Sequence, residues 1–207
     1  MSIISERVAN QYPAFIMTFL SILVGFAIED VISIIRADAR LESLNLVSAV
    51  LWSQAAVCIG VAITAWIGFG QITMAKRAVP TPFEIVLIVG FTLLFFWLNS
   101  LIGVSAMYKW YFAMAIYSLA GAITTYIVGR FAENEGHQFL AYNRGLRGPI
   151  ILVLGFAAWF FLIGYLSWRN WLNSSMDILI NLSALVGLSL YVWFLNWVWR
   201  TKLLSTE

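Results

Sequence analysis

Two adjacent carboxylic acids, Glu29 and Asp30, stand inside an apolar run that extends from Pro13 to Ile35. The run is long enough to cross a bilayer, where a carboxylate raises the free energy of helix insertion. Acids retained at such a depth typically attract cations, relay protons or join helices. The pair is therefore the strongest candidate for function in this sequence.

Helical periodicity separates the two acids. At i, i+4 spacing, Ser21, Gly25, Glu29 and Ser33 form a polar stripe on one face of a helix, whereas Asp30 is rotated from Glu29 by about 100°. If the span is centred near Val24, Glu29 lies about 7 to 8 Å from the membrane midplane at 1.5 Å rise per residue. We predict that Glu29, Ser21 and Gly25 belong to a permeation or proton/cation site, and that Asp30 is a structural or docking acid.

Three interpretations of the acidic pair remain open. Glu29 borders water and attracts cations or relays protons; or one of the acids is held by Arg36 or a polar neighbour; or the helix shifts outward and both acids reach the interface. Asn99, in a later apolar segment, is predicted to lie in the same half of the bilayer as Glu29 and joins the permeation site. Asp177 and Asn181 also fall in this half, which predicts a polar vestibule.

The composition excludes a soluble domain. The chain has 207 residues, of which 62% are hydrophobic and 11% charged, whereas soluble domains carry roughly 25% charged residues. A net charge of +2 gives no reason to expect a nucleic-acid partner. One cysteine, Cys58, and one histidine, His137, cannot by themselves build a zinc or bis-histidine haem site. We therefore predict no enzymatic activity, no catalytic residue, no metal and no cofactor.

Six segments of membrane-spanning length must position these residues, at about 20 residues per span. The sequence predicts an all-α, polytopic integral membrane protein with six transmembrane helices, forming a single domain over 1–207. The only long polar loop is predicted at about 130–148, and the connection between the third and fourth spans is a tight one around Met107–Lys109. The predicted spans are Pro13–Ile35, Leu46–Gln71, Pro82–Ala106, Trp110–Val128, Pro149–Trp168 and Met176–Val198.

The positive charges predict the orientation. Cytoplasmic loops of membrane proteins carry an excess of Lys and Arg. In this layout Arg36, Arg40, Lys109 and Arg169 lie on one side of the membrane, and the other eight basic residues lie on the side of the termini. Both termini are therefore predicted to be cytoplasmic, in a bacterial inner (plasma) membrane. The N-terminus does not read as a cleaved signal peptide.

Small residues recur at helical spacing in two further spans. Gly60, Thr64 and Gly68 share one face of the second span, and Ser118, Gly121 and Thr125 share one face of the fourth. Small residues let helices approach closely in lipid. We interpret both faces as helix-packing surfaces.

Two function classes follow from these observations. The first is an oligomeric membrane channel or transport protein for cations or protons, with a permeation path lined partly by the first helix. The second is a non-catalytic membrane subunit that docks other membrane proteins or lipids. Both predict contact with the lipid bilayer, and either a homo-oligomer or a membrane complex.

Overall fold

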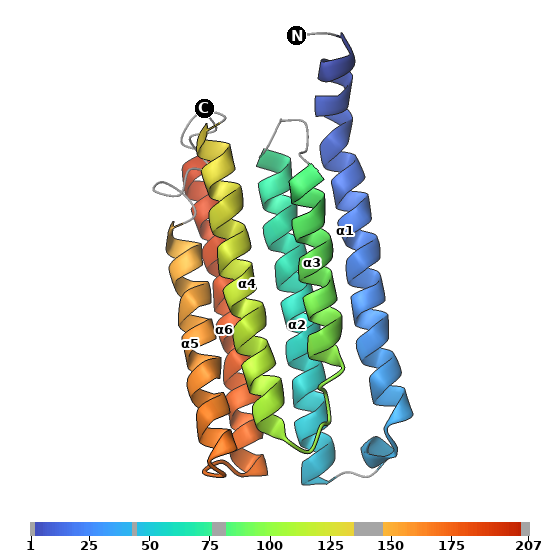
Figure 1. Ribbon diagram of the computed structural model, residues 1–207, viewed down its shortest axis with the longest axis vertical. Helices are drawn as coiled ribbons and strands as arrows, with labels where there is room; N and C mark the ends of the chain where they lie inside the picture. The colour runs from blue at the N-terminus through green and yellow to red at the C-terminus, as the bar shows by residue number, and fades with distance from the viewer. Residues whose placement is uncertain (1–2, 43–44, 76–81, 135–146, 204–207) are drawn as a thin grey trace.

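The chain folds into helices wherever its structure is described. The computed structural model describes residues 3–42, 45–75, 82–134 and 147–203, and these residues contain no strand. The all-α prediction is therefore confirmed. The elements, drawn in Figure 1, are α1 (Ile3–Ala37), the short 3-10 helix η1 (Ala39–Glu42), α2 (Leu46–Ala75), α3 (Pro82–Asn99), α4 (Met107–Asn134), α5 (Arg147–Trp168) and α6 (Ser174–Leu203).

Five of these helices are long and apolar enough to cross a membrane. Their apolar parts are Ala14–Ala37, Leu46–Gln71, Met107–Ile127, Arg147–Trp168 and Ser174–Val198. The apolar part of α3, Ile85–Asn99, is shorter. The prediction of six full-length spans thus exceeds by one what the described residues contain, although α3 runs beside the other helices over much of their length (Figure 1).

The helices form an antiparallel bundle whose two ends differ. The connections α1–α2, α3–α4 and α5–α6 all lie at one end, which we call the distal end (Figure 1). The first residues of α1 and the last residues of α6 lie at the opposite, terminal end. The predicted polar loop begins within α4, which continues to Asn134, and its residues 135–146 lie outside the described residues.

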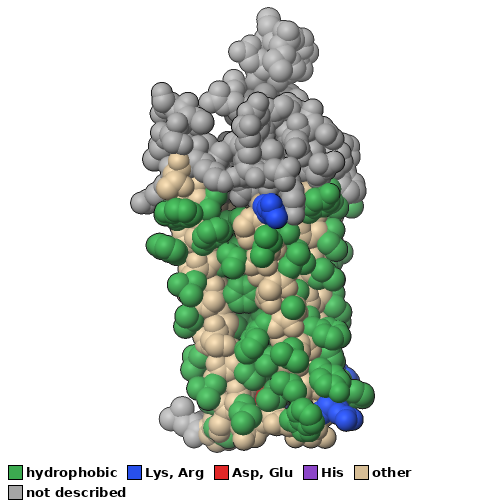
Figure 2. Space-filling view, turned by 90° about the vertical axis from the view of Figure 1, so that its left-hand side faces the viewer, with side chains coloured by type: hydrophobic (Ala, Val, Ile, Leu, Met, Phe, Trp, Pro, Cys, Tyr) green, Lys and Arg blue, Asp and Glu red, His purple; other side chains and the backbone are tan. Residues whose placement is uncertain are grey.

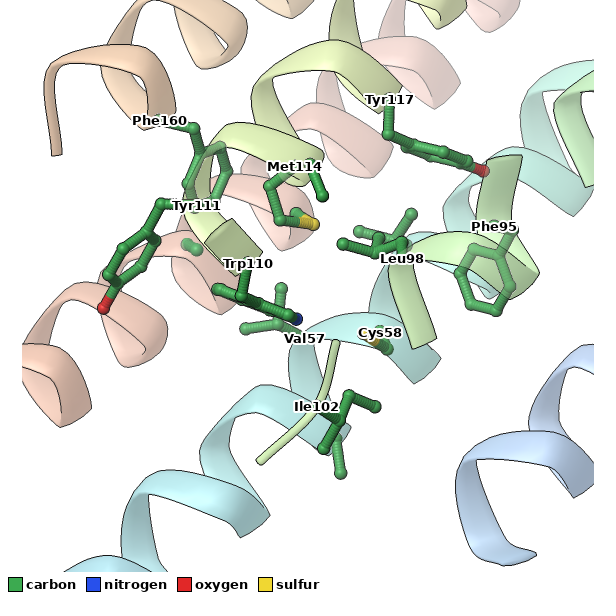
Figure 3. Close-up of a cluster of buried hydrophobic side chains, with 14 of the residues drawn as sticks. Val57, Cys58, Phe95, Leu98, Ile102, Trp110, Tyr111, Met114, Tyr117 and Phe160 are labelled. Carbon is green, nitrogen blue, oxygen red and sulfur yellow. The ribbon is translucent and has the colours of Figure 1, made fainter. Parts of the chain in front are cut away.

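The core is concentrated around α2 and the distal half of α4. More than half of the apolar span of α2 is buried, against less than a quarter for α1 and α6. Trp110 and Tyr111 of α4 are fully buried, and Figure 3 shows Trp110 reaching towards Val57 and Cys58 of α2. Large apolar side chains fill the distal half of the bundle and leave it tightly packed.

The outer surface is apolar along most of its length. Figure 2 shows one face, where hydrophobic side chains cover the middle and Lys or Arg side chains lie near the two ends. Exposed side chains such as Leu179, Trp193 and Phe161 are more than half accessible. Such a surface would cause aggregation in water but suits contact with lipid. A membrane location follows from these several apolar helices.

The third helix ends earlier than predicted. We expected it to reach Ala106 with a tight connection at Met107–Lys109, but α3 stops at Asn99 and α4 already begins at Met107. Gly103, in the connection, has a φ of 75°, a left-handed conformation that glycine adopts without steric cost. The chain therefore turns before the predicted end of the span.

Polar contacts tie this connection to its neighbours. The Gly103 N–H donates to Gln54 Oε1 of α2 at 3.1 Å, and Arg40 Nη2 donates to the Gly103 carbonyl at 3.0 Å. Arg40 also forms an ion pair with Asp38. The Arg40 guanidinium lowers the pKa of the Asp38 carboxyl below its ordinary value, mainly through their hydrogen bond. The α1–α2 connection thereby holds the α3–α4 connection at the distal end.

Candidate functional site

The predicted polar stripe of α1 lies on the outside of the bundle. Ser21, Gly25, Glu29 and Ser33 are all exposed, and no atom would contact a Cβ added at Gly25 within 4 Å. Measured from the middle of the Ala14–Ala37 span, Glu29 lies about 5 Å towards the distal end. Within a single chain the stripe therefore borders no internal path.

The Ser21 hydroxyl group of this stripe is satisfied locally. The Ser21 hydroxyl donates to the Met17 carbonyl at 2.7 Å and accepts from Trp66 Nε1 of α2 at 3.2 Å. Such back-bonding lets serine reside in a membrane helix without an unpaired donor. Glu29, in contrast, has no hydrogen bond or ion pair within the part of the chain that the structure describes. Its carboxyl group is the one acidic group on this face, and no described residue of the chain pairs with it.

Asp30 turns inward, towards α3. Asn99 Nδ2 donates to Asp30 Oδ2 at 3.0 Å and to the Ala27 carbonyl at 3.3 Å. Asp30 is half-buried and Asn99 is fully buried. The structure thus brings Asn99 together with Asp30 and not with Glu29, Ser21 or Gly25. Arg36 forms no ion pair with either acid among the described residues.

Two further polar contacts join helices in the distal half. Tyr111 donates its hydroxyl to Asp177 Oδ1 of α6 at 2.7 Å, and Asn181 Nδ2 donates to Ser53 Oγ of α2 at 2.8 Å. Asp177 and Asn181 are buried. These two contacts and the Asp30–Asn99 contact all lie in the distal half of the bundle. These side chains link helices and do not line an open vestibule within one chain.

Replacing Tyr111 by Phe is expected to lower the free energy of unfolding by about 1 kcal/mol. The substitution removes the donor to a carboxyl that is only 6% exposed. Chemical unfolding in detergent measures the change, and Tyr165→Phe, at an exposed tyrosine of α5, is the matched control. The effect of Asp177→Asn should shrink in the Tyr111→Phe background; equal effects in both backgrounds would contradict the contact.

A cavity of about 130 Å³ occupies the other half of the bundle. It lies between α2, α4, α5 and α6, and Phe91 of α3 also borders it. Met114, Tyr117 and Phe160, shown in Figure 3, lie at its distal side. The core described above therefore closes the cavity on that side.

The two small-residue faces meet at this cavity. Thr64 and Gly68 of α2, with Ser118, Gly121 and Thr125 of α4, all line it. We interpreted these faces as packing surfaces. A Cβ added at Gly121 would indeed contact Phe91 at 3.5 Å, whereas one added at Gly68 would meet no atom within 4 Å. The spacing of small residues in the sequence locates both helix faces. It does not show whether such a face packs against a neighbouring helix or borders a cavity.

Among the described residues, no group of three or more His, Cys, Asp or Glu side chains lies close enough together to hold a metal ion. No family model, curated protein or solved structure matches this chain. The exposed acidic face of α1 is therefore the main indication of function in the described residues.

Proposed function

We propose that this chain is a subunit of an oligomeric membrane channel or transport protein for cations or protons. The exposed face of α1, defined by Ser21, Gly25, Glu29 and Ser33, borders the permeation path in this proposal. One observation carries it: Glu29 is an exposed carboxylic acid near the middle of a membrane span, with no partner among the described residues of its own chain.

The energetics favour water or protein over lipid at this face. A charged side chain at the centre of a span costs about 2.5 to 3.5 kcal/mol on insertion scales. The cost falls when the carboxylate borders a water-filled path or contacts another subunit. Exposed apolar side chains flank the stripe: Ile22 and Phe26, each about half exposed, lie on one side of it, and Ile32, 37% exposed, lies on the other. A polar strip between apolar margins suits a path enclosed by packed helices.

The alternative is a non-catalytic subunit whose α1 face docks another membrane protein. In this alternative, the unpaired Glu29 carboxyl group contacts a polar side chain of the other membrane protein instead of water. The two proposals differ in whether water reaches the stripe, and a cysteine introduced there distinguishes them.

A Gly25→Cys variant is expected to react with a charged, membrane-impermeant thiol reagent and to form disulfide-linked dimers under oxidation. Gly25 has open space at its Cβ position, and the native thiol, Cys58, is fully buried. Gly155→Cys is the matched control, because Gly155 is also exposed near the middle of its span with open space around it. Gel mobility and mass spectrometry measure both reactions.

The outcomes separate the proposals. Labelling and dimerisation of Gly25→Cys, with neither at Gly155→Cys, support a water-lined path between copies. Shielding of Gly25→Cys by a different protein, without labelling, supports the docking subunit. Behaviour identical to Gly155→Cys would mean that the α1 face meets lipid, which contradicts both.

A further inference from the structure

The cavity between α2, α4, α5 and α6 is elongated along the axis of the bundle. On α2 its lining residues extend from Val61 to Gln71, and on α4 from Met114 to Thr125. At 1.5 Å rise per residue, these stretches are about 15 to 17 Å long. Gln71 is the last residue of the apolar part of α2, and Val61 lies near the middle of that part. The cavity therefore extends from the middle of the membrane span to its boundary at the terminal end.

This depth matches one leaflet of a bilayer. The hydrocarbon core is about 30 Å thick, so the acyl chains of one leaflet occupy about 15 Å of it. The other two helices give the same limits, because Pro149 and Leu195 lie near the terminal ends of their spans, and Phe160 and Ala184 lie near the middles. The cavity thus covers the depth of the acyl chains in the leaflet at the terminal end.

The wall of the cavity suits an apolar chain better than water. Aromatic and aliphatic side chains form most of it, and no Asp, Glu, Lys or Arg appears among its described lining residues. Two of its hydroxyl groups are already engaged, because Thr64 donates to the Gly60 carbonyl and Thr125 to the Gly121 carbonyl. An enclosed water needs about two to four polar partners. An apolar chain instead restores the dispersion contacts that side chains lack where they border empty space.

The deep end of the cavity is shielded from the lipid that surrounds the bundle. Met114, Tyr117 and Ala184 line this end and are each at most 5% exposed. Phe91 of α3 closes the gap between α2 and α4, since its ring centroid lies 5.5 Å from that of Phe69 and 4.2 Å from that of Tyr117. The cavity as a whole is only partly enclosed. A chain whose end reaches these residues can therefore stay attached to a headgroup outside the bundle.

We propose that this cavity binds one acyl chain of a phospholipid from the leaflet at the terminal end. The end of the chain lies beside Met114 and Ala184, and its ester end lies near Thr125 and Leu195. The apolar wall selects the chain, and the depth of the cavity sets its direction. The site is separate from the exposed face of α1 and does not depend on permeation.

The test uses the full-length protein in phosphatidylcholine vesicles that contain one of two photoreactive phosphatidylcholine probes. The first probe carries a diazirine at the end of one acyl chain, and the second carries it next to the ester. After illumination, mass spectrometry maps the modified residues. We expect the first probe to modify Met114 and Ala184, and the second to modify Thr125 and Leu195. This comparison of depths needs no variant of the protein.

A pair of glycine variants locates the site. Gly68 lines the cavity, and a Cβ added there would meet no atom within 4 Å. Gly68→Phe should lower the modification of Met114 and Ala184 by at least about tenfold, because a ring and a chain cannot occupy the same space. Modification of Leu190, which is 60% exposed on α6, should stay unchanged and shows that the variant is folded. Gly90→Phe is the matched control, since Gly90 is exposed on α3 with equally open surroundings.

Several outcomes would overturn the proposal. One is modification of Leu190 without modification of Met114 and Ala184 in the wild-type protein. Another is an equal loss at these two residues in both phenylalanine variants. Modification by a diazirine-bearing free fatty acid but not by the phospholipid probes would assign the cavity to a different occupant. Glu29→Gln should leave the pattern unchanged, so failure here is distinguishable from failure of the channel proposal.

Discussion

Replacing Glu29 by Gln is expected to lower cation or proton flux through the reconstituted protein by at least about tenfold. A tenfold change corresponds to about 1.4 kcal/mol in the barrier. A carboxylate 4 Å from a cation contributes about 4 kcal/mol at an effective dielectric constant of 20, so losing a third of this attraction suffices. Glutamine keeps the size of the side chain and removes the charge and the titratable proton. Flux into liposomes, driven by an ion gradient, measures the effect.

Asp30→Asn is the matched control for this experiment. Asparagine at position 30 keeps an oxygen that can accept from Asn99 Nδ2, which now lies 3.0 Å from Asp30 Oδ2. The α1–α3 contact should therefore survive while one negative charge is lost from the neighbouring position. We expect nearly normal flux in this variant. Loss of flux in Asp30→Asn with normal flux in Glu29→Gln would reverse the roles assigned to the two acids.

The different environments of the two acids follow in part from helix geometry alone. A rotation of about 100° per residue predicts that Glu29 and Asp30 cannot share one face, and the structure places Glu29 outside and Asp30 against α3. The partner of Asp30 was not predictable in the same way. Periodicity gives the direction in which a side chain points from the axis of its own helix. It does not give which neighbouring helix lies in that direction.

Sequence patterns were sufficient to predict the ends of some helices but not of others. The predicted second span, Leu46–Gln71, coincides with the apolar part of α2, because charged or polar residues lie beyond both of its ends. The third span was predicted too long because Leu101, Ile102 and Val104 continue the apolar pattern past Asn99. Hydropathy does not register the backbone turn at Gly103, which depends on contacts with Gln54 and Arg40 from other elements.

The cavity could not be predicted because the small-residue stripe of α2 is packed against α6 at Gly60 and borders open space at Gly68. A Cβ at Gly60 would approach Leu185 and Leu188 of α6 at 3.3 Å, as expected for a packed face. Two helical turns further along α2, a Cβ at Gly68 would meet nothing within 4 Å. The difference lies in the side chains that α6 and the other helices present opposite each glycine. Spacing within α2 contains no information about them.

Replacing Gly103 by Ala is expected to lower the free energy of unfolding by about 2 to 5 kcal/mol. The left-handed backbone at φ 75° costs about 1 to 2 kcal/mol for a residue with a Cβ. That Cβ would also lie 2.7 Å from Leu51 Cδ2 and from Arg40 Nη2, and Leu51 belongs to the buried core. Overpacking of this kind typically adds about 1 to 3 kcal/mol.

The neighbouring contacts explain why relaxation should relieve little of this cost. Arg40 is held by Asp38 and by the Gly103 carbonyl, and moving the connection away from Leu51 would break the bond from the Gly103 N–H to Gln54. Gly90→Ala is the matched control, because Gly90 is helical and exposed with open surroundings, and alanine there should be neutral or stabilising by about 0.5 to 1 kcal/mol. Chemical and thermal unfolding in detergent measure both variants. A Gly103→Ala protein as stable as Gly90→Ala would show that this connection neither requires a left-handed residue nor packs against Leu51 as described.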